Sequence, residues 1–166
     1  MLSPDIYSAS DVIGMLQLEP LPHEGGWFRR TGEGSGLRAD ASARRGWSSI
    51  LALFTPDGFS ALHRLTADEI WCFHAGDALT SLRLHPGGSV ESVTLGFDLT
   101  RGERVQDVVR AGIWQGTCLR AGGRWALVSC VVAPEFRWED FELGRRSDLQ
   151  RRFPAWAETI ARLTRD

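Results

Sequence analysis

A histidine and a glutamate near the middle of the chain are the residues best suited to acid–base chemistry. They are His63 and Glu69, in the segment GFSALHRLTADEIWCFHAG at residues 58–76. Side chains two residues apart on a strand point to the same face, so both can face one interior if residues 66–68 form a hairpin. A buried imidazole and a buried carboxylate are costly unless they bond each other, a metal or a ligand. The pair therefore predicts a polar site inside a β-structure, unless it only pins two strands together.

Aromatic side chains would form the wall of this site. Trp71 and Phe73 follow Glu69 in steps of two residues, and Trp27 near the start of the chain is a further candidate. Such rings stack well on the ring or sugar face of a small molecule. Arginines could in addition select a carboxylate or phosphate, because guanidinium groups match these oxyanions, or they could be solvated surface charges. The candidates are Arg29, Arg30 and Arg64.

Two absences limit the chemistry further. All 19 basic residues are arginine, which excludes Schiff-base catalysis by a lysine amine. The only tyrosine, Tyr7, lies in the N-terminal segment, so no phenol is expected as a general acid in the core. If His63 acts as the base, held and oriented by Glu69, the acid opposite it must be His74, His85 or a water molecule.

Composition and charge exclude several classes of partner. The net charge of -2 and the pI near 6.1 leave no basic excess for binding nucleic acid. No apolar run approaches the roughly 20 residues that span a bilayer, and residues 1–10 lack the features of a signal peptide. We therefore expect a cytoplasmic protein without a membrane partner, folded as one domain over residues 1–166. Three widely spaced cysteines predict buried free thiols rather than disulfides or a CxxC metal site, namely Cys72, Cys118 and Cys130.

The elements that must position the site are mainly short strands. Residues 47–132 contain runs of branched and aromatic residues that are separated about every 8 to 14 residues by turn signals. Such spacing is typical of an all-β sandwich or barrel. The turn signals lie at residues 56–58, 86–88, 101–103 and 121–123.

The N-terminal region predicts a short amphipathic helix and a strand. Residues 8–18 begin with Ser8 and Asp11 at the spacing of a capping box, and one helical face carries Val12, Met15 and Leu16. Residues 24–40 lack apolar periodicity and predict an opening strand followed by a loop that could cover the mouth of a barrel.

The C-terminal region predicts a helical segment at about residues 147–164. Pro154 is expected to begin or kink the helix. Its apolar stripe would pack on the barrel or on a second subunit, and consists of Leu149, Phe153, Trp156, Ile160 and Leu163.

Residues 58–76 resemble the first cupin motif, G-x5-H-x-H-x3-E-x6-G. His63 fills the first histidine position, Glu69 fills the acidic position, and Gly76 is the closing glycine. Leu65 replaces the second histidine, and the glycine before His63 is one residue closer than the motif requires.

The second cupin motif, G-x5-P-x-G-x2-H-x3-N, is echoed in VVRAGIWQG at residues 108–116. Gly112 fits, Arg110 replaces the proline, and Gln115 stands where the histidine is expected. The chain is similar to the Cupin 5 family, whose members largely lack an assigned function and in which Leu65 and Gln115 fit the usual pattern. The matching blocks, in order, are residues 24–27, 63–64, 68–71, 75–77, 95–96, 111–115, 133–134 and 140–142.

The resemblance implies an all-β fold, a double-stranded β-helix or cupin jelly-roll barrel with short N- and C-terminal helices. The barrel would occupy about residues 20–143, and the protein would be a homodimer. Three positions depart from the family pattern. His74 stands where a tyrosine is frequent, Arg30 where an acidic residue is frequent, and Glu135 where a glycine is frequent.

Three functions fit the candidate residues. The first is metal-independent isomerase- or epimerase-like chemistry on a sugar-like or hydroxy-acid ligand, with His63 and Glu69 as catalytic residues. The second is non-catalytic binding or sensing of a small molecule through Gln115, Trp71, Phe73, Arg64 and Trp27. The third is a metal-dependent oxygenase or isomerase whose ligands would be His63, Glu69 and Gln115, although an amide oxygen is a weak ligand for zinc, iron or copper. We expect no cofactor in the first two cases and a divalent metal only in the third.

Overall fold

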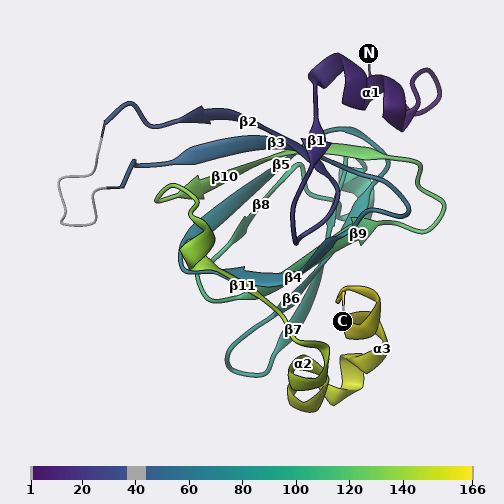
Figure 1. Cartoon of the computed structure of the whole chain (residues 1–166). Coiled ribbons are helices and arrows are strands. Elements are labelled where there is room, and N and C mark those ends of the chain that lie inside the picture. Colours follow the sequence, from purple (N-terminus) through teal and green to yellow (C-terminus); the bar gives the residue numbers. More distant parts are fainter. Residues whose placement is uncertain (1, 37–43, 166) are drawn as a thin grey trace.

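The computed structural model describes residues 2–36 and 44–165, which form two antiparallel β-sheets and short helices (Figure 1). The six-stranded sheet has the order β1 (Glu19–Pro20), β2 (Trp27–Glu33), β3 (Ser48–Phe54), β10 (Ala126–Ala133), β5 (Asp68–Gly76), β8 (Gln106–Val109). The five-stranded sheet has the order β11 (Phe141–Leu143), β4 (Ser60–Leu65), β9 (Trp114–Leu119), β6 (Leu79–Leu84), β7 (Val90–Leu95). The predicted all-β fold with short helices is confirmed. Part of the predicted loop, residues 37–40, lies outside the described residues.

The inner faces of the two sheets share one apolar core. On β5 the side chains of Glu69, Trp71 and Phe73 are buried, whereas His74 is exposed, because successive side chains of a strand point to opposite faces. The same alternation on the neighbouring strands fills the interior with Ala52, Phe54, Leu79, Leu95, Val109, Ala126, Val128 and Cys130.

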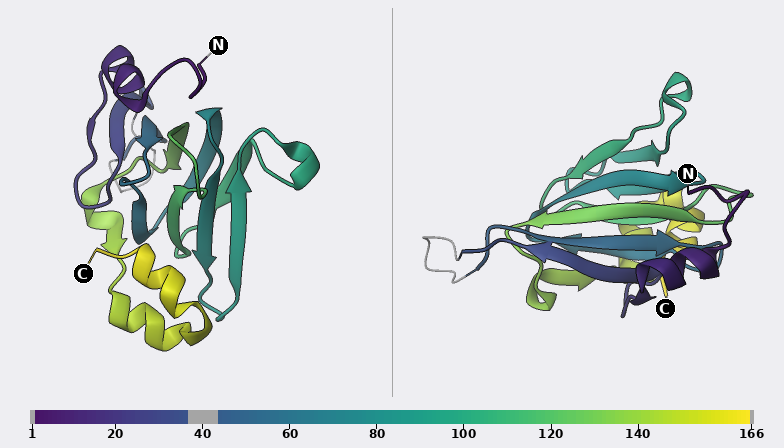
Figure 2. Two further views of the ribbon diagram at one scale, coloured as in Figure 1. Left: turned by 90° about the vertical axis from the view of Figure 1, so that its right-hand side faces the viewer. Right: turned by 90° about the horizontal axis from the view of Figure 1, so that it is seen from above.

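Helices cover part of the outer face of each sheet (Figures 1 and 2). The helix α1 (Ala9–Leu16) begins with the predicted capping box of Ser8 and Asp11 and packs on the six-stranded sheet through Val12, whereas Met15 is 54% exposed. The C-terminal elements α2 (Arg146–Arg152), η3 (Pro154–Trp156) and α3 (Ala157–Arg162) pack on the five-stranded sheet. Their apolar stripe packs on the barrel, which is one of the two predicted alternatives. In chain order it consists of Leu149, Phe153, Trp156, Ile160 and Leu163.

The strands β4 and β5 do not form a hairpin. β4 pairs with β9 and β11, whereas β5 pairs with β10 and β8. The short connection at residues 66–67 therefore crosses from one sheet to the other. The predicted hairpin at residues 66–68 is wrong, because the sequence marks where two strands end but not which strands they pair with. His63 and Glu69 consequently project into the interior from different sheets.

The four predicted turns are confirmed. Residues 56–58 join β3 to β4, residues 86–88 join β6 to β7, and residues 121–123 join β9 to β10. Residues 101–103 lie between β7 and β8, beside the one-turn helix η1 (Leu99–Arg101).

The structure also bears on two predictions that were made from composition, the free cysteines and the lack of a membrane-spanning segment. The three cysteines are free, but only Cys130 is fully buried, while the thiols of Cys72 and Cys118 are half-buried. Within residues 2–36 and 44–165, none of the helices has the length and apolar character needed to cross a membrane.

Candidate functional site

A cavity of about 360 Å³ opens between the inner face of the six-stranded sheet and β4. Its inner end is formed by four buried residues, His63, Glu69, Trp71 and Cys130. More exposed residues lie at its mouth, among them Glu19, Arg30, Phe136 and Trp138. Apolar side chains of β2, β3 and β10 complete the wall, including Phe28, Ile50, Phe54 and Val132. The cavity thus joins an aromatic and aliphatic wall to a small polar end.

The imidazole of His63 is held in one orientation at the polar end. Only 2% of the residue is exposed, and its Nδ1 lies 2.8 Å from the backbone oxygen of Ala61. A carbonyl oxygen can only accept, so Nδ1 must carry a proton, and in the neutral imidazole the lone pair is then on Nε2. The ring also stacks on Phe141 with centroids 5.0 Å apart, and Glu24 Oε1 lies 3.9 Å from Nδ1. Among the described residues nothing is hydrogen-bonded to Nε2, which leaves a basic nitrogen for a ligand.

The carboxyl group of Glu69 lies in a protected environment. Burial raises its pKa above the ordinary value of 4.5, the neighbouring imidazole of His63 acts in the opposite direction, and the carboxyl of Glu24 raises it again. Gln115 Nε2 donates a hydrogen bond of 2.5 Å to Glu69 Oε2. The net direction is upward, so the structure favours the protonated form of Glu69 more than water would.

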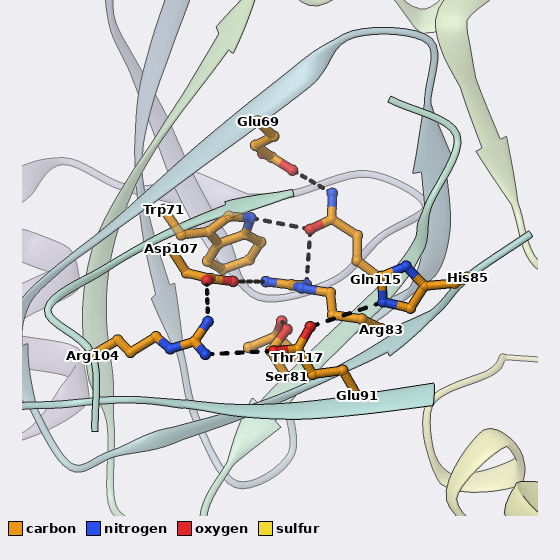
Figure 3. A network of polar contacts seen from close by, with 10 residues as sticks. All are labelled: Glu69, Trp71, Ser81, Arg83, His85, Glu91, Arg104, Asp107, Gln115 and Thr117. Atoms are coloured by element: carbon orange, nitrogen blue, oxygen red, sulfur yellow. Dashed lines mark hydrogen bonds and ion pairs between the residues drawn. The ribbon is translucent and has the colours of Figure 1, made fainter. Parts of the chain in front are cut away.

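The amide of Gln115 is fixed by two donors on its other side (Figure 3). Its Oε1 accepts hydrogen bonds of 3.1 Å from Trp71 Nε1 and of 3.1 Å from Arg83 Nη1. Indole and guanidinium groups can only donate, so the amide oxygen must face them and the amide nitrogen must face Glu69. Gln115 is therefore a rigid bridge behind Glu69, and it is not among the residues that line the cavity.

A buried arginine supports this bridge and connects it to the surface. Arg83 is 3% exposed, and its Nη2 lies 3.1 Å from Asp107 Oδ2. Burial lowers the pKa of Arg83, while the adjacent Asp107 raises it. From Asp107 the network continues through Arg104 and Glu91 to His85, as Figure 3 shows.

The residues present do not fit the divalent metal that the cupin resemblance implies. Leu65 offers no ligand, and the amide oxygen of Gln115 is turned away from Glu69 toward two donors. In the described parts of the chain, no group of three or more His, Cys, Asp or Glu side chains could hold a metal ion together. His63 and Glu69 lack the third and fourth donors that transition metals require.

Several sequence-predicted ligand-binding residues lie away from the cavity. Phe73 belongs to the apolar core but does not line the cavity, and its ring centroid lies 4.9 Å from that of Phe97. Trp27 packs against the cluster beneath α1 on the outer face of the sheet. Arg64 points outward, where its Nε donates to Glu142 Oε2 at 2.7 Å. Of the predicted wall residues, Trp71 alone lines the cavity.

The histidines considered as acids also lie elsewhere. His74 Nε2 is 2.8 Å from Ser129 Oγ on the exposed face of β5, as its position on the strand predicts. His85 is near the surface, 3.8 Å from Glu91. Neither lines the cavity.

Sequence reasoning missed three charged residues of the interior. Arg83 could have been found, because it stands two residues after Ser81 on a strand and shares the inward face with it. Glu24 lies in the block at residues 24–27 that carries the family resemblance, but no local pattern points its side chain toward His63. For Asp107 no local signal exists.

The departures at Arg30 and Glu135 adjoin each other at the cavity mouth. Arg30 Nη2 lies 3.8 Å from Glu135 Oε2 and 2.8 Å from Glu33 Oε2. The two unusual residues therefore form part of one ion-pair cluster.

Comparison with known families agrees with this architecture. Residues 10–144 match the Cupin 5 family model, described as cupin superfamily (DUF985). The chain belongs to the Cupin 5 family. A protein from Shewanella oneidensis is 38% identical, with a TM-score of 0.88 over 96% of this chain and 98% of that one. A hypothetical protein from Leishmania major is 30% identical, also with a TM-score of 0.88, over 96% of this chain and 100% of that one.

More distant cupins share the fold alone. Oxalate decarboxylase from Bacillus subtilis is 14% identical with a TM-score of 0.55, over 95% of this chain and 38% of that one. No curated protein matches the chain significantly. The predicted cupin jelly roll is therefore confirmed, and the function must be argued from the cavity itself.

Proposed function

We propose that this cupin binds a small molecule in the cavity and catalyses metal-independent proton transfer on it, as an isomerase or epimerase does. One observation carries the proposal. A histidine with a free Nε2 and a carboxyl group with a raised pKa line the same small cavity. A histidine nitrogen and a carboxyl group that line one cavity are residue types suited to the roles of base and acid.

The roles follow from the bonds of each group. Nε2 of His63 would accept a proton from a carbon of the ligand, and the Nδ1–H bond to Ala61 keeps the ring in place while the charge forms. Protonated Glu69 would deliver its proton to another atom of the ligand, leaving a carboxylate that Gln115 stabilises. The sequence-based role of Glu69 as the group that orients His63 is replaced, since the carbonyl of Ala61 does this. The acid that sequence reasoning did not find in the core is then Glu69.

Deuterium exchange tests the proposal directly. The protein is incubated in D₂O with sugars, hydroxy acids and primary amines, and incorporation of deuterium at carbon is followed by NMR. We expect His63→Asn to lower the exchange rate by about 10² to 10⁴, the usual contribution of an acid–base residue, because asparagine keeps an N–H donor but has no basic nitrogen. Glu69→Gln should lower it similarly. Arg64→Gln, which changes an outward-facing residue beside His63, should leave the rate unchanged.

Non-catalytic binding or sensing is the alternative, and the mainly apolar wall of the cavity favours it. A ligand that raises the Tm of the protein and is recovered unchanged, with no deuterium in any compound, would establish that alternative and refute the catalytic proposal. The homodimer implied by the resemblance stays a prediction.

A further inference from the structure

One carboxyl group at the cavity has no arginine partner among the described residues. The side chain of Glu24 is 14% exposed, and no arginine lies within ion-pair distance of it in the described parts of the chain. Its Oε1 accepts a hydrogen bond of 2.5 Å from Ser60 Oγ and lies 3.9 Å from His63 Nδ1. Buried carboxylates are normally paired, so a charged partner from outside the chain would stabilise this one.

The other charges on the wall disfavour an anionic ligand. The lining residues include three carboxyl side chains but a single arginine, Arg30. That guanidinium group is already engaged in ion pairs with Glu33 at 2.8 Å and Glu135 at 3.8 Å. An incoming carboxylate or phosphate would therefore meet carboxyl groups and would have to break existing ion pairs to find a cation.

Two polar atoms of the cavity-lining residues have no hydrogen-bond donor among the described residues. Nδ1–H of His63 is used by a backbone carbonyl, and no described residue is hydrogen-bonded to Nε2 of this cavity-lining residue, which is 2% exposed. The second oxygen of Glu24 is also without a hydrogen bond from the described residues. A ligand head that satisfies the oxygens of Glu24 must donate hydrogen bonds, and an ammonium group has up to three N–H donors. Nε2 of His63 then stays available for the carbon-bound proton.

Aromatic rings line the rest of the path. They are Phe28, Phe54, Trp71, Phe136 and Trp138. The faces of such rings attract cations and also cover apolar groups. A cation with an apolar body is consequently matched both by the polar end and by the wall.

We infer that the ligand of this cavity is a small primary or secondary amine, bound as its ammonium ion with Glu24 as the anionic partner. The inference rests on the proposed function, because the same cavity is taken as the reaction site. It replaces the expected sugar-like or hydroxy-acid ligand with an amine. Glu69 stays the proton donor, while Glu24 holds the charged head. The volume of about 360 Å³ restricts the ligand to a small one, since ligand cavities range over about 300–1,000 Å³.

Three probes of one shape test the inference. Benzylamine, benzyl alcohol and benzoate share a ring and a one-carbon arm but carry a positive, a neutral and a negative head. Calorimetric titration of the whole protein should show that benzylamine binds at least tenfold more tightly than benzyl alcohol, and that benzoate binds least. Equal or tighter binding of the alcohol or of benzoate, or no measurable binding of benzylamine, would overturn the inference.

Variants separate this inference from the proposed chemistry. Glu24→Gln keeps the acceptor for Ser60 but removes the charge, and it should reduce benzylamine affinity at least tenfold while leaving benzyl alcohol unchanged. Glu139→Gln removes a carboxylate that is 71% exposed and lies outside the cavity, so it should change neither affinity. An amine preference that survives Glu24→Gln in a folded protein overturns the inference.

The two failures have different signatures. A protein that prefers benzylamine but exchanges no proton in any compound keeps the amine assignment and refutes the acid–base function. A protein that exchanges protons in sugars or hydroxy acids only, in a manner that depends on His63 and Glu69, keeps the function and overturns the amine assignment.

Discussion

Replacing Gln115 with methionine should destabilise the protein strongly, because the two side chains have similar length but methionine forms none of the three hydrogen bonds. The change leaves Glu69 Oε2, Trp71 Nε1 and Arg83 Nη1 without their partner in the interior. A buried polar group without a partner costs about 1–3 kcal/mol. Arg83 keeps its bond to Asp107, and Glu69 can take up a proton. We therefore expect the summed cost for the three groups to lie near its lower limit, a loss of about 3–5 kcal/mol in unfolding free energy. This is a large part of the roughly 5–15 kcal/mol that stabilises a typical domain.

Urea unfolding followed by tryptophan fluorescence measures the loss. The midpoint should fall while the m-value stays constant, as expected when stability changes but the exposed surface does not. Gln106→Met is the matched control, because Gln106 is exposed and its amide contacts only Cys72 Sγ at 3.4 Å. It should change stability by no more than about 0.5 kcal/mol. A loss below about 1 kcal/mol for Gln115→Met would falsify the view that this amide holds the site together.

Burial and charge lead to four more predictions. The raised pKa of Glu69 means that the folded state binds its proton more tightly than the unfolded state, so this group stabilises the fold below pH 4.5 and the contribution is lost as pH rises through the folded pKa. Urea midpoints measured from pH 4 upward should decline less in Glu69→Gln than in the unchanged protein, and an identical pH profile would contradict the raised pKa of Glu69. Burial raises the pKa of the Cys130 thiol well above 9.0, so mass spectrometry should find that iodoacetamide alkylates half-buried Cys72 first and Cys130 only on unfolding. Leu149→Ala should cost about 2–5 kcal/mol in unfolding free energy because Leu149 is 3% exposed, whereas Met15→Ala should cost less than about 0.5 kcal/mol. Sedimentation equilibrium should give twice the chain mass of 18.4 kDa if the predicted homodimer forms, and a monomer at all concentrations would refute it.

Local patterns in the sequence predicted those parts of the fold that depend on neighbouring residues. Step-of-two spacing identified the inward face of β5, with Glu69 and Trp71 buried and His74 outside. Capping at Ser8 and the stripe that includes Phe153 were equally local signals. Each of these depends on one element and its own periodicity.

The parts that failed depend on contacts between distant segments. The partner strands of β4 and β5 follow from the whole sheet order, which no local pattern contains. Phe73 was correctly placed inside, but it does not line the cavity that Trp71 lines. Trp27 was named as a further candidate for the wall because it is aromatic, although it packs beneath α1. The orientation of Gln115 depends on Trp71 and Arg83, which lie on two other strands.

The connection at residues 66–67 has a consequence for how His63 and Glu69 stay together. His63 and Glu69 are anchored on different sheets, yet only a few covalently linked residues separate them. The distance between the two residues is thus set by a short connection. Motion at the remote edges of the sheets and the length of the other turns should affect it little. Insertions at the turn of residues 86–88 should be tolerated, whereas a single residue added after Thr66 should increase the distance between His63 and Glu69.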